Sequence, residues 1–585
     1  MAETRLVVEH REQLWSLLVE AAQIEHMIMC QYLYACFSLK TELDEGLTAG
    51  QAEAVARWQE TVTGIAIEEM LHLALVMNVM TAIGAAPSLS RPNFPRHSEF
   101  LPPGVEFALL PFGTDSLTHF LYLERPEGME RVDAAEFVPA APPPAPVGGA
   151  EVMPRVQGFL TVGHLYRGIE DGLTHLASKL GERALFVGPA RAQATPELFH
   201  WPQLIAVTDL ASARAALDEI IEQGEGARGD WRSAHYGRFL NIWNEYQRLR
   251  EQDPSFEPAR PVMPAFTRQP FDIDEPQPLV TDPLTREVAE LFNLGYEVLL
   301  QVLTRFFTHT DETDKQLDAL VQAAFGIMDG LTGLAARLGE RALFPGPRRA
   351  QATPELFGGW PQLIAVTGLD SACAAIEEII EQGEGARGDW QSAHYGRFLG
   401  IWEEYHRLRE EDPDFEPARP VIPAFTRQPF DITEPQPLLT DPATRSVAEL
   451  FNLGYEVLLQ VLTRFFTHTD ETDEQLGTLV ESAFGLMTGV MRPLGAALTR
   501  MPAGPGHPGR TAGPVFEMYY QMGNFTPWRE AAWALLSERV AVMSGRCADH
   551  AGLADAPDAV AAAAQAAAAI PAQLAAHVPA ELRPA

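Results

Sequence analysis

The sequence contains little cysteine and little positive charge. Only four cysteines occur among its 585 residues and none forms a C-x-x-C pair, so neither a zinc finger nor a disulfide framework is indicated. Reduced thiols fit a reducing compartment, and we expect a cytoplasmic protein. Lysine and arginine total 43 against 79 aspartates and glutamates, a formal net charge of −36. Such a surface would repel a phosphate backbone, so we expect no binding to nucleic acid.

Long apolar runs and nucleotide motifs are also missing. No uninterrupted run approaches the roughly 18 apolar residues needed to cross a bilayer, and the charged N-terminal segment lacks the apolar core of a secretory signal. We therefore expect no membrane partner. No Gly-rich nucleotide loop, Walker motif or G-x-S-x-G elbow follows a predicted strand. Nucleotide cofactors and serine hydrolysis are accordingly not expected.

The apolar residues that are present follow a helical pattern. Apolar residues recur every three to four positions over 12–40 and 52–83, which predicts two long antiparallel helices. Residues 88–150 are rich in proline and aromatic residues, and because proline cannot continue a helix they predict a long crossover loop. Further helices are predicted at about 161–185 and 231–250. This order predicts an all-α fold with a ferritin-like four-helix bundle and one long crossover.

The rest of the chain contains an internal duplication. EQGEGARGDW begins at Glu222 and again at Glu381, and matching of this quality relates about 170–327 to about 328–486. The repeat is too long for a solenoid and indicates a duplicated gene segment. The predicted domains are a metal-binding bundle with its crossover, a duplicated helical segment, a C-terminal helical domain and a loosely packed Ala/Pro-rich tail: 1–270, 271–430, 431–550 and 551–585.

A metal-binding pattern lies in the second predicted helix. In IEEMLHLALVMNVM, Glu69 and His72 stand one turn apart on the same helix face, as a metal ion held between helices requires. The spacing alone is weak evidence. It also occurs in two pairs that we interpret as a loop coincidence and a solvated helix face: Glu197 with His200, and Glu403 with His406.

Donors on the other predicted helices strengthen this interpretation. Glu25 stands among apolar residues of the first helix, Glu170 lies on the third and His235 on the fourth. A buried carboxylate without a partner is costly, so a glutamate on the inner face of a bundle favours a cation that facing helices can share. Carboxylates with imidazoles suit iron or manganese.

Four segments resemble a known family. IEHMIMCQYLYACFSL, IEEMLHLALVMNVMTAIGAAP, GHLYRGIEDGL and SAHYGRFLNIW, in that order, resemble the ferritin-like domain of the iminophenyl-pyruvate dimer synthase family over about residues 12–250. The resemblance implies a non-haem metal centre, expected to be di-iron with manganese as an alternative, and a small amino-acid-derived substrate. A homo-oligomer is possible on this reading. The positions that match metal ligands are Glu25, Glu69, His72, Glu170 and His235.

The pattern departs from a usual di-iron bundle in one place. Such bundles carry a second E-x-x-H, but Arg232 stands three residues before His235, so a sixth ligand is not identified. His394 duplicates His235, and either could complete the bundle. The second copy has Met328 in place of Glu170 and lacks the first two helices, which predicts one metal centre per chain.

Three functions remain open from the sequence. One is an oxidoreductase that couples two imines in secondary metabolism. Another keeps the site but uses it for oxygen-dependent oxidation or N-oxygenation of a small substrate. The third is a non-catalytic binding or scaffold protein with a degenerate metal site, since a fold alone does not fix a function.

Overall fold

The computed structural model describes most of the chain. It leaves out residues 1–7, 41–42, 98–104, 127–128, 130–158, 160, 227–230, 261, 271–272, 274–275, 282, 336–368, 386–390, 430–434, 519–524, 554–555 and 583–585. The described residues are predominantly helical, which confirms the all-α prediction. Their one sheet is a small antiparallel pair, β1 (Arg96–His97) and β2 (Glu106–Phe107).

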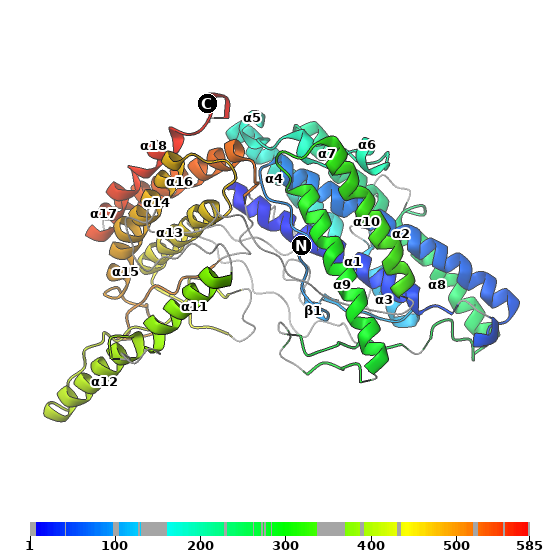
Figure 1. Cartoon of the computed structure of the whole chain (residues 1–585), viewed down its shortest axis with the longest axis horizontal. Coiled ribbons are helices and arrows are strands. Elements are labelled where there is room, and N and C mark those ends of the chain that lie inside the picture. Colours follow the sequence, from blue (N-terminus) through cyan, green and yellow to red (C-terminus); the bar gives the residue numbers. More distant parts are fainter. Residues whose placement is uncertain are drawn as a thin grey trace.

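The N-terminal body is a helical bundle (Figure 1). The antiparallel hairpin of α1 and α2 packs along most of its length, α4 packs on α1, and α7 closes the ring against α2 and α4. The helix α8 lies outside this ring, against α2 and α3. The helices of this body are α1 (Arg11–Ser38), α2 (Ala49–Ala82), α3 (Thr114–Leu123), α4 (Val162–Leu180), α7 (Leu210–Gly224) and α8 (His235–Gln252).

Two features of the bundle differ from the sequence-based prediction. The fourth helix of the ring is α7, whereas the prediction gave that role to the segment of α8. The crossover predicted over 88–150 contains α3, because the short amphipathic segment TDSLTHFLYL lies between prolines that masked its period. The remaining elements here are short: η1 (Leu43–Glu45), α5 (Glu182–Leu185), η3 (Ala190–Ala192) and α6 (Pro196–Phe199).

Local sequence explains where α2 begins and ends. The Thr48 hydroxyl accepts a hydrogen bond from the Gln51 backbone N–H, and the Gln51 side chain accepts one from the Thr48 N–H, forming a capping box. After the last turn Gly84 adopts φ +84°, and a Cβ there would meet the Leu535 side chain at 2.3 Å. Only glycine fits this position without strain.

The helix α2 is also long and apolar enough to cross a membrane by length and composition. However, 72% of its most apolar window is buried inside the protein. It carries the buried polar residues Glu69, His72 and Asn78 on its inner faces. These features are those of the central helix of a helical bundle.

The C-terminal body packs around α13 and α16 (Figure 1). Its helices are α13 (Pro442–Phe466), α14 (Asp473–Gly485), the π-helical turn η5 (Leu486–Met491), α15 (Arg492–Leu498), α16 (Arg529–Ala551), α17 (Asp558–Ala567) and α18 (Ile570–Ala575), with a final turn η6 (Ala580–Leu582). The Ala/Pro-rich tail was expected to pack loosely, but Val560, Ile570 and Leu574 are fully buried against this body. Small alanine side chains let α17 approach α16 and η5 closely, which the composition alone did not reveal.

Buried charges join the two bodies. The Arg11 guanidinium donates to the carbonyls of Leu185 and Ile83 and pairs with Glu538 of α16. Arg539 of α16 pairs in turn with Glu12 of α1. Because breaking a buried pair leaves an uncompensated charge, these contacts fix how the bundle meets α16.

The duplicated segments occupy different environments. The helix pair α9 (Pro283–Phe307) and α10 (Asp314–Ala335) packs mainly on itself and beside α6 of the bundle. The hairpin of α11 (Leu369–Glu384) and α12 (His394–Glu411) projects away from both bodies (Figure 1). The counterpart of α9–α10 is α13–α14 of the C-terminal body, and the counterpart of α11–α12 is α7–α8 of the bundle. Similar sequences therefore have different neighbours in the two copies.

Candidate metal centre

A cluster of carboxylates and imidazoles lies between the helices of the N-terminal body. Glu25 comes from α1, Glu69 and His72 from α2, and His235 is the first residue of α8. Glu124 follows directly after α3. All five side chains are buried, so no bulk water screens their charges.

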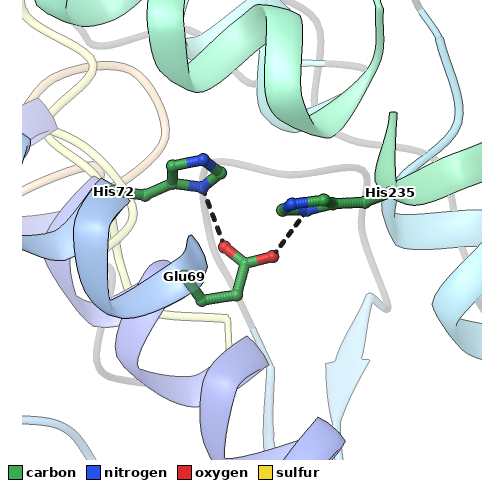
Figure 2. Close-up of side chains that lie close together, drawn as sticks. All are labelled: Glu69, His72 and His235. Carbon is green, nitrogen blue, oxygen red and sulfur yellow. Dashed lines mark hydrogen bonds and ion pairs between the residues drawn. The ribbon is translucent and has the colours of Figure 1, made fainter. Parts of the chain in front are cut away.

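Glu69 stands at the centre of this cluster. Its Oε2 atom lies 2.9 Å from His72 Nδ1 and its Oε1 atom lies 2.9 Å from His235 Nδ1, so one carboxylate contacts both imidazoles (Figure 2). Ligand atoms of these three residues all lie within 4.8 Å of one another, and they form the one such group found among the described residues. The arrangement suits a metal ion on either side of a shared carboxylate.

Two further carboxylates make the cluster nearly symmetric. Glu25 Oε2 lies 3.4 Å from His72 Nδ1, and Glu124 Oε1 lies 3.7 Å from His235 Nδ1. The two imidazole rings face each other with centroids 5.3 Å apart. Each imidazole thus has its own carboxylate and shares Glu69, so these donors could hold a metal ion.

The outer nitrogens of both imidazoles have partners of their own. His72 Nε2 lies 3.1 Å from the Gln223 side-chain oxygen, and His235 Nε2 lies 2.8 Å from Glu68 Oε2. Donation from Nε2–H to these oxygens leaves each Nδ1 lone pair facing the cluster. Nδ1 of His235 makes no hydrogen bond of good geometry despite its full burial, and a bound metal would satisfy it.

Two tyrosines hold the outer carboxylates. The Tyr166 hydroxyl on α4 donates a short hydrogen bond to Glu25, and the Tyr32 hydroxyl on α1 donates one to Glu124. Both tyrosines are fully buried. The Tyr166 phenol contacts Glu25 Oε1 and leaves Oε2 toward His72, whereas Tyr32 donates to the same Glu124 oxygen, Oε1, that lies nearest His235 Nδ1. Each phenol thus restricts the orientation of its carboxylate.

The metal-free cluster retains protons. Burial and the neighbouring Glu69 charge raise the pKa of Glu25 to about 8. Burial opposes the charged form of His72, but the Glu69 and Glu25 carboxylates outweigh it and raise the pKa of the imidazole to about 10. Likewise, burial opposes protonation of His235, but Glu69 and Glu124 raise its pKa. These protons balance buried negative charge, and a metal cation would replace them.

The space at the cluster is small. A cavity of about 20 Å³ lies beside Glu25, Glu69, His72 and Glu124, with room for a water-sized molecule or ion. Its other walls come from the α3 end, the α4 start and the α7 end: Ile28, Leu123, Val162, Gly163, Tyr166, Ile220, Ile221, Gly224 and Glu225. Carboxylate and imidazole donors beside a space of this size could hold a metal ion.

The structure brings together four of the five ligands proposed from the sequence. Glu25, Glu69, His72 and His235 meet, but Glu170 does not: its carboxylate is partly exposed and pairs with Arg214 Nε of α7 at 3.2 Å. The inner position of α4 belongs to Tyr166, one turn before Glu170. Helix period alone did not reveal which of these faces turns inward.

Sequence reasoning missed Glu124. It lies in the segment expected to be a loop, where no long helical period drew attention to it. The available signal was the acidic residue that closes the amphipathic segment TDSLTHFLYL. Glu124 supplies the carboxylate next to His235 that the absent second E-x-x-H would have supplied.

The structure also distinguishes the two duplicated histidines. His235 is fully buried in the cluster, whereas His394 begins the projecting helix α12 and is exposed. Within the described part of the chain the second copy brings no carboxylate pair to His394. The described structure therefore contains one candidate centre, formed with the first copy.

The match to one protein family agrees with this architecture. A family model described as Ferritin-like matches residues 18–244 and 289–403, more than half of the chain. A crystal structure of a ferritin-like protein from Caulobacter vibrioides aligns with a TM-score of 0.38 and 18% identity, covering 58% of this chain and all of that one.

Two curated relatives are similar in sequence. A dichlorochromopyrrolate synthase from Lentzea aerocolonigenes is 28% identical over 372 residues, which cover 57% of this chain and 34% of that protein. A 2-imino-3-(indol-3-yl)propanoate dimerase from Chromobacterium violaceum is 26% identical over 341 residues, which cover 55% of this chain and 32% of that protein. The chain thus spans about a third of the length of these relatives. The resemblance to dimer synthases expected from the sequence is confirmed as a distant one.

Proposed function

We propose, from the premise that this chain belongs to the ferritin-like family, that it binds a pair of iron ions around Glu69 and oxidises a small substrate derived from an aromatic amino acid. The observation that carries the proposal is the position of Glu69 between two buried imidazoles, each with its own second carboxylate. Manganese is the alternative ion, since it accepts the same donors.

The substrate class rests on the relatives. One of them is named for dimerising an imine that carries an indole group, and the other for making a dichlorochromopyrrolate. We propose the same class of reaction here, in which two imines derived from an aromatic amino acid join through a new carbon–carbon bond. Such a coupling breaks one C–H bond in each imine and releases two protons and two electrons, which reduce one dioxygen to hydrogen peroxide. Bound iron would supply the redox chemistry for this transfer.

The residues of this chain would hold and shield the reaction. Tyr166 and Tyr32 fix the outer carboxylates, while Gln223 and Glu68 fix the imidazole rings. Apolar side chains around the cavity exclude water from the donors. The cavity accepts a molecule the size of dioxygen, but an indole needs far more space. The imine would therefore approach at the cavity wall formed by α4 and α7.

A second candidate is a binding or scaffold protein with a metal site that does no chemistry. The small cavity favours it, because the space beside the donors is too small for an aromatic substrate. Here the metal would stabilise the bundle by neutralising buried carboxylates.

The experiment that separates the two candidates begins with metal-free protein loaded anaerobically with Fe(II). We expect about two iron ions per chain by elemental analysis. The loaded protein is then given dioxygen and an imine generated in place from tryptophan by an amino-acid oxidase, with zinc-loaded protein as control. A dimer of the imine that forms only with iron supports the enzyme. Bound iron with no dimer, and with oxygen uptake no greater than that of the oxidase in the zinc-loaded control, supports the binding protein.

A further inference from the structure

The α11–α12 hairpin carries a large exposed apolar surface. The two helices pack on each other, and within the described part of the chain neither packs extensively on another helix. Seven large apolar side chains on them, which we call the hairpin patch, are 41% to 71% exposed: Ile376, Ile379, Ile380, Tyr395, Phe398, Ile401 and Trp402. Their spacing of three and four residues places them along one stripe of each helix.

The first copy shows what these stripes are suited to do. The hairpin α7–α8 carries nearly the same residues at matching positions, and there they are buried. Phe239 and Ile242 of α8 match Phe398 and Ile401, yet they are at most 4% exposed. Leu217 and Ile220 of α7, which match Ile376 and Ile379, are at most 3% exposed. The apolar faces that close the bundle in one copy therefore pack on no other helix in the second copy, as far as the described residues show.

The size of the patch matches that of a protein interface. Large aromatic side chains cover about 150–250 Å² each when buried, so seven large side chains that are 41% to 71% exposed present several hundred Å² of surface. Soluble monomers rarely expose contiguous apolar patches of more than about 300–600 Å². Standard interfaces bury about 800 Å² per partner. The hairpin patch is therefore large enough for one stable contact.

The fold indicates which partner surface is free. In the bundle, the position where such a face packs is already occupied by α7–α8. His235, the first residue of α8, contacts Glu68 and Glu69 there. A second copy of this chain offers one equally apolar and uncovered surface, its own hairpin patch. Two identical patches can meet across a two-fold axis, which is the commonest symmetry of soluble oligomers.

We propose that the α11–α12 hairpin is a self-association element, and that two copies of this chain dimerise by packing their hairpin patches together into a four-helix interface. The duplication thus gave the protein a second bundle-forming hairpin that works between chains. Acidic residues outnumber basic ones on both helices. Because like charges then face each other across the dimer, added salt should strengthen the association.

The test measures the mass of the full-length protein in solution by sedimentation equilibrium over a wide concentration range. We expect a dimer of the 64.3 kDa chain, with at least tenfold tighter association at high salt than at low salt. The double variant Phe398→Glu with Ile401→Glu should be monomeric. A matched control is Leu553→Glu, which places the same charge on an apolar residue that is 60% exposed outside the hairpin. It should dimerise like the parent protein.

Helix content by circular dichroism shows whether the variants are folded, and iron content shows whether the bundle is intact. A parent protein that stays monomeric at all concentrations would overturn the proposal. So would a dimer that survives the double variant, or one that Leu553→Glu disrupts equally. A fourth contrary outcome is a domain swap, in which α12 of one chain replaces α8 of the other. It would be seen as a dimer whose iron is lost in His394→Ala.

Discussion

His235 Nδ1 lies 2.9 Å from Glu69 Oε1, which joins the first turn of α8 to the middle of α2 across 166 residues of chain. Neither helix period nor sequence spacing requires this contact. It arises because α8 packs outside the ring, against α2 and α3, with its N-terminus directed at the cluster. The single contact brings the second imidazole to the central carboxylate and so determines what the site can bind.

Glu69→Ala should remove iron from the protein, whereas Glu170→Ala should leave it bound. Glu69 contacts both imidazoles, so its loss removes the donor that both ions would share. Glu170 pairs with Arg214 outside the cluster and serves as a control of the same residue type in the same bundle. Elemental analysis of both variants after anaerobic loading gives the result. Iron loss in Glu170→Ala would show that the sequence-based assignment holds and that α4 is turned differently.

His235→Ala should lose iron, whereas His394→Ala should retain it. The buried imidazole of His235 belongs to the cluster, while its duplicate begins the exposed helix α12. The two histidines lie in nearly identical local sequences but at different positions in the fold. Iron per chain, measured in both variants, therefore shows which position matters for binding. Equal loss in both would mean that each copy builds its own centre.

Tyr166→Phe should weaken iron binding about 10- to 100-fold. The phenol holds one oxygen of Glu25, and without it the buried carboxylate is free to turn away from His72. Tyr34→Phe is the matched control, because the Tyr34 hydroxyl is buried without a hydrogen-bond partner. Competition with a chelator of known affinity measures the change. Equal iron affinities in the two variants would contradict a positioning role for Tyr166.

Iron binding should release protons and become tighter as pH rises from about 6 to 9. The pKa of His72 is raised to about 10 and that of Glu25 to about 8, so both groups are protonated at neutral pH in the metal-free protein. Both must lose their protons to bind iron. Calorimetry in two buffers with different ionisation enthalpies counts the protons. Release of fewer than one proton per chain at pH 7 would contradict these raised pKa values.

The same shifts predict how the metal-free protein responds to pH. A raised folded-state pKa gives stability that is present below the unfolded-state value and is lost as pH rises through the folded-state value. For His72 this window is about 6.5 to 10, and for Glu25 about 4.5 to 8. Thermal unfolding should therefore occur at lower temperature at pH 9 than at pH 6. Iron-loaded protein should lack most of this decline, since its ligands are already deprotonated.

Leu574→Ala should destabilise the C-terminal body by about 2 to 4 kcal/mol. Leu574 of α18 is fully buried, although its segment reads as a loose tail. Leu553→Ala removes the same atoms from a side chain that is 60% exposed and should change stability by less than about 0.5 kcal/mol. Calorimetric unfolding of both variants measures the difference. Similar small effects would restore the original expectation of a loosely packed tail.

The sequence predicted the elements of the site better than their assembly. The E-x-x-H spacing identified Glu69 and His72 because one helix turn fixes which side chains share a face. Glu25 and His235 were singled out because a polar donor stood in an apolar context, and in the structure they lie beside this pair. Glu124 was missed and Glu170 was chosen instead, because the rotation of α4 and the position of α3 depend on packing partners that are distant in the sequence.

By itself, then, the sequence determined the helices, the duplication and the pairing of carboxylate with imidazole on α2, since these depend on local periodicity and on repeated text. Tertiary structure decided the rest. It placed α7 in the ring and α8 outside it, turned Tyr166 inward and Glu170 outward, and left the hairpin patch uncovered while burying its near duplicate. The physical reason is that the sequence of a helix fixes its apolar stripe, whereas the elements that neighbour the helix in space determine what packs against that stripe.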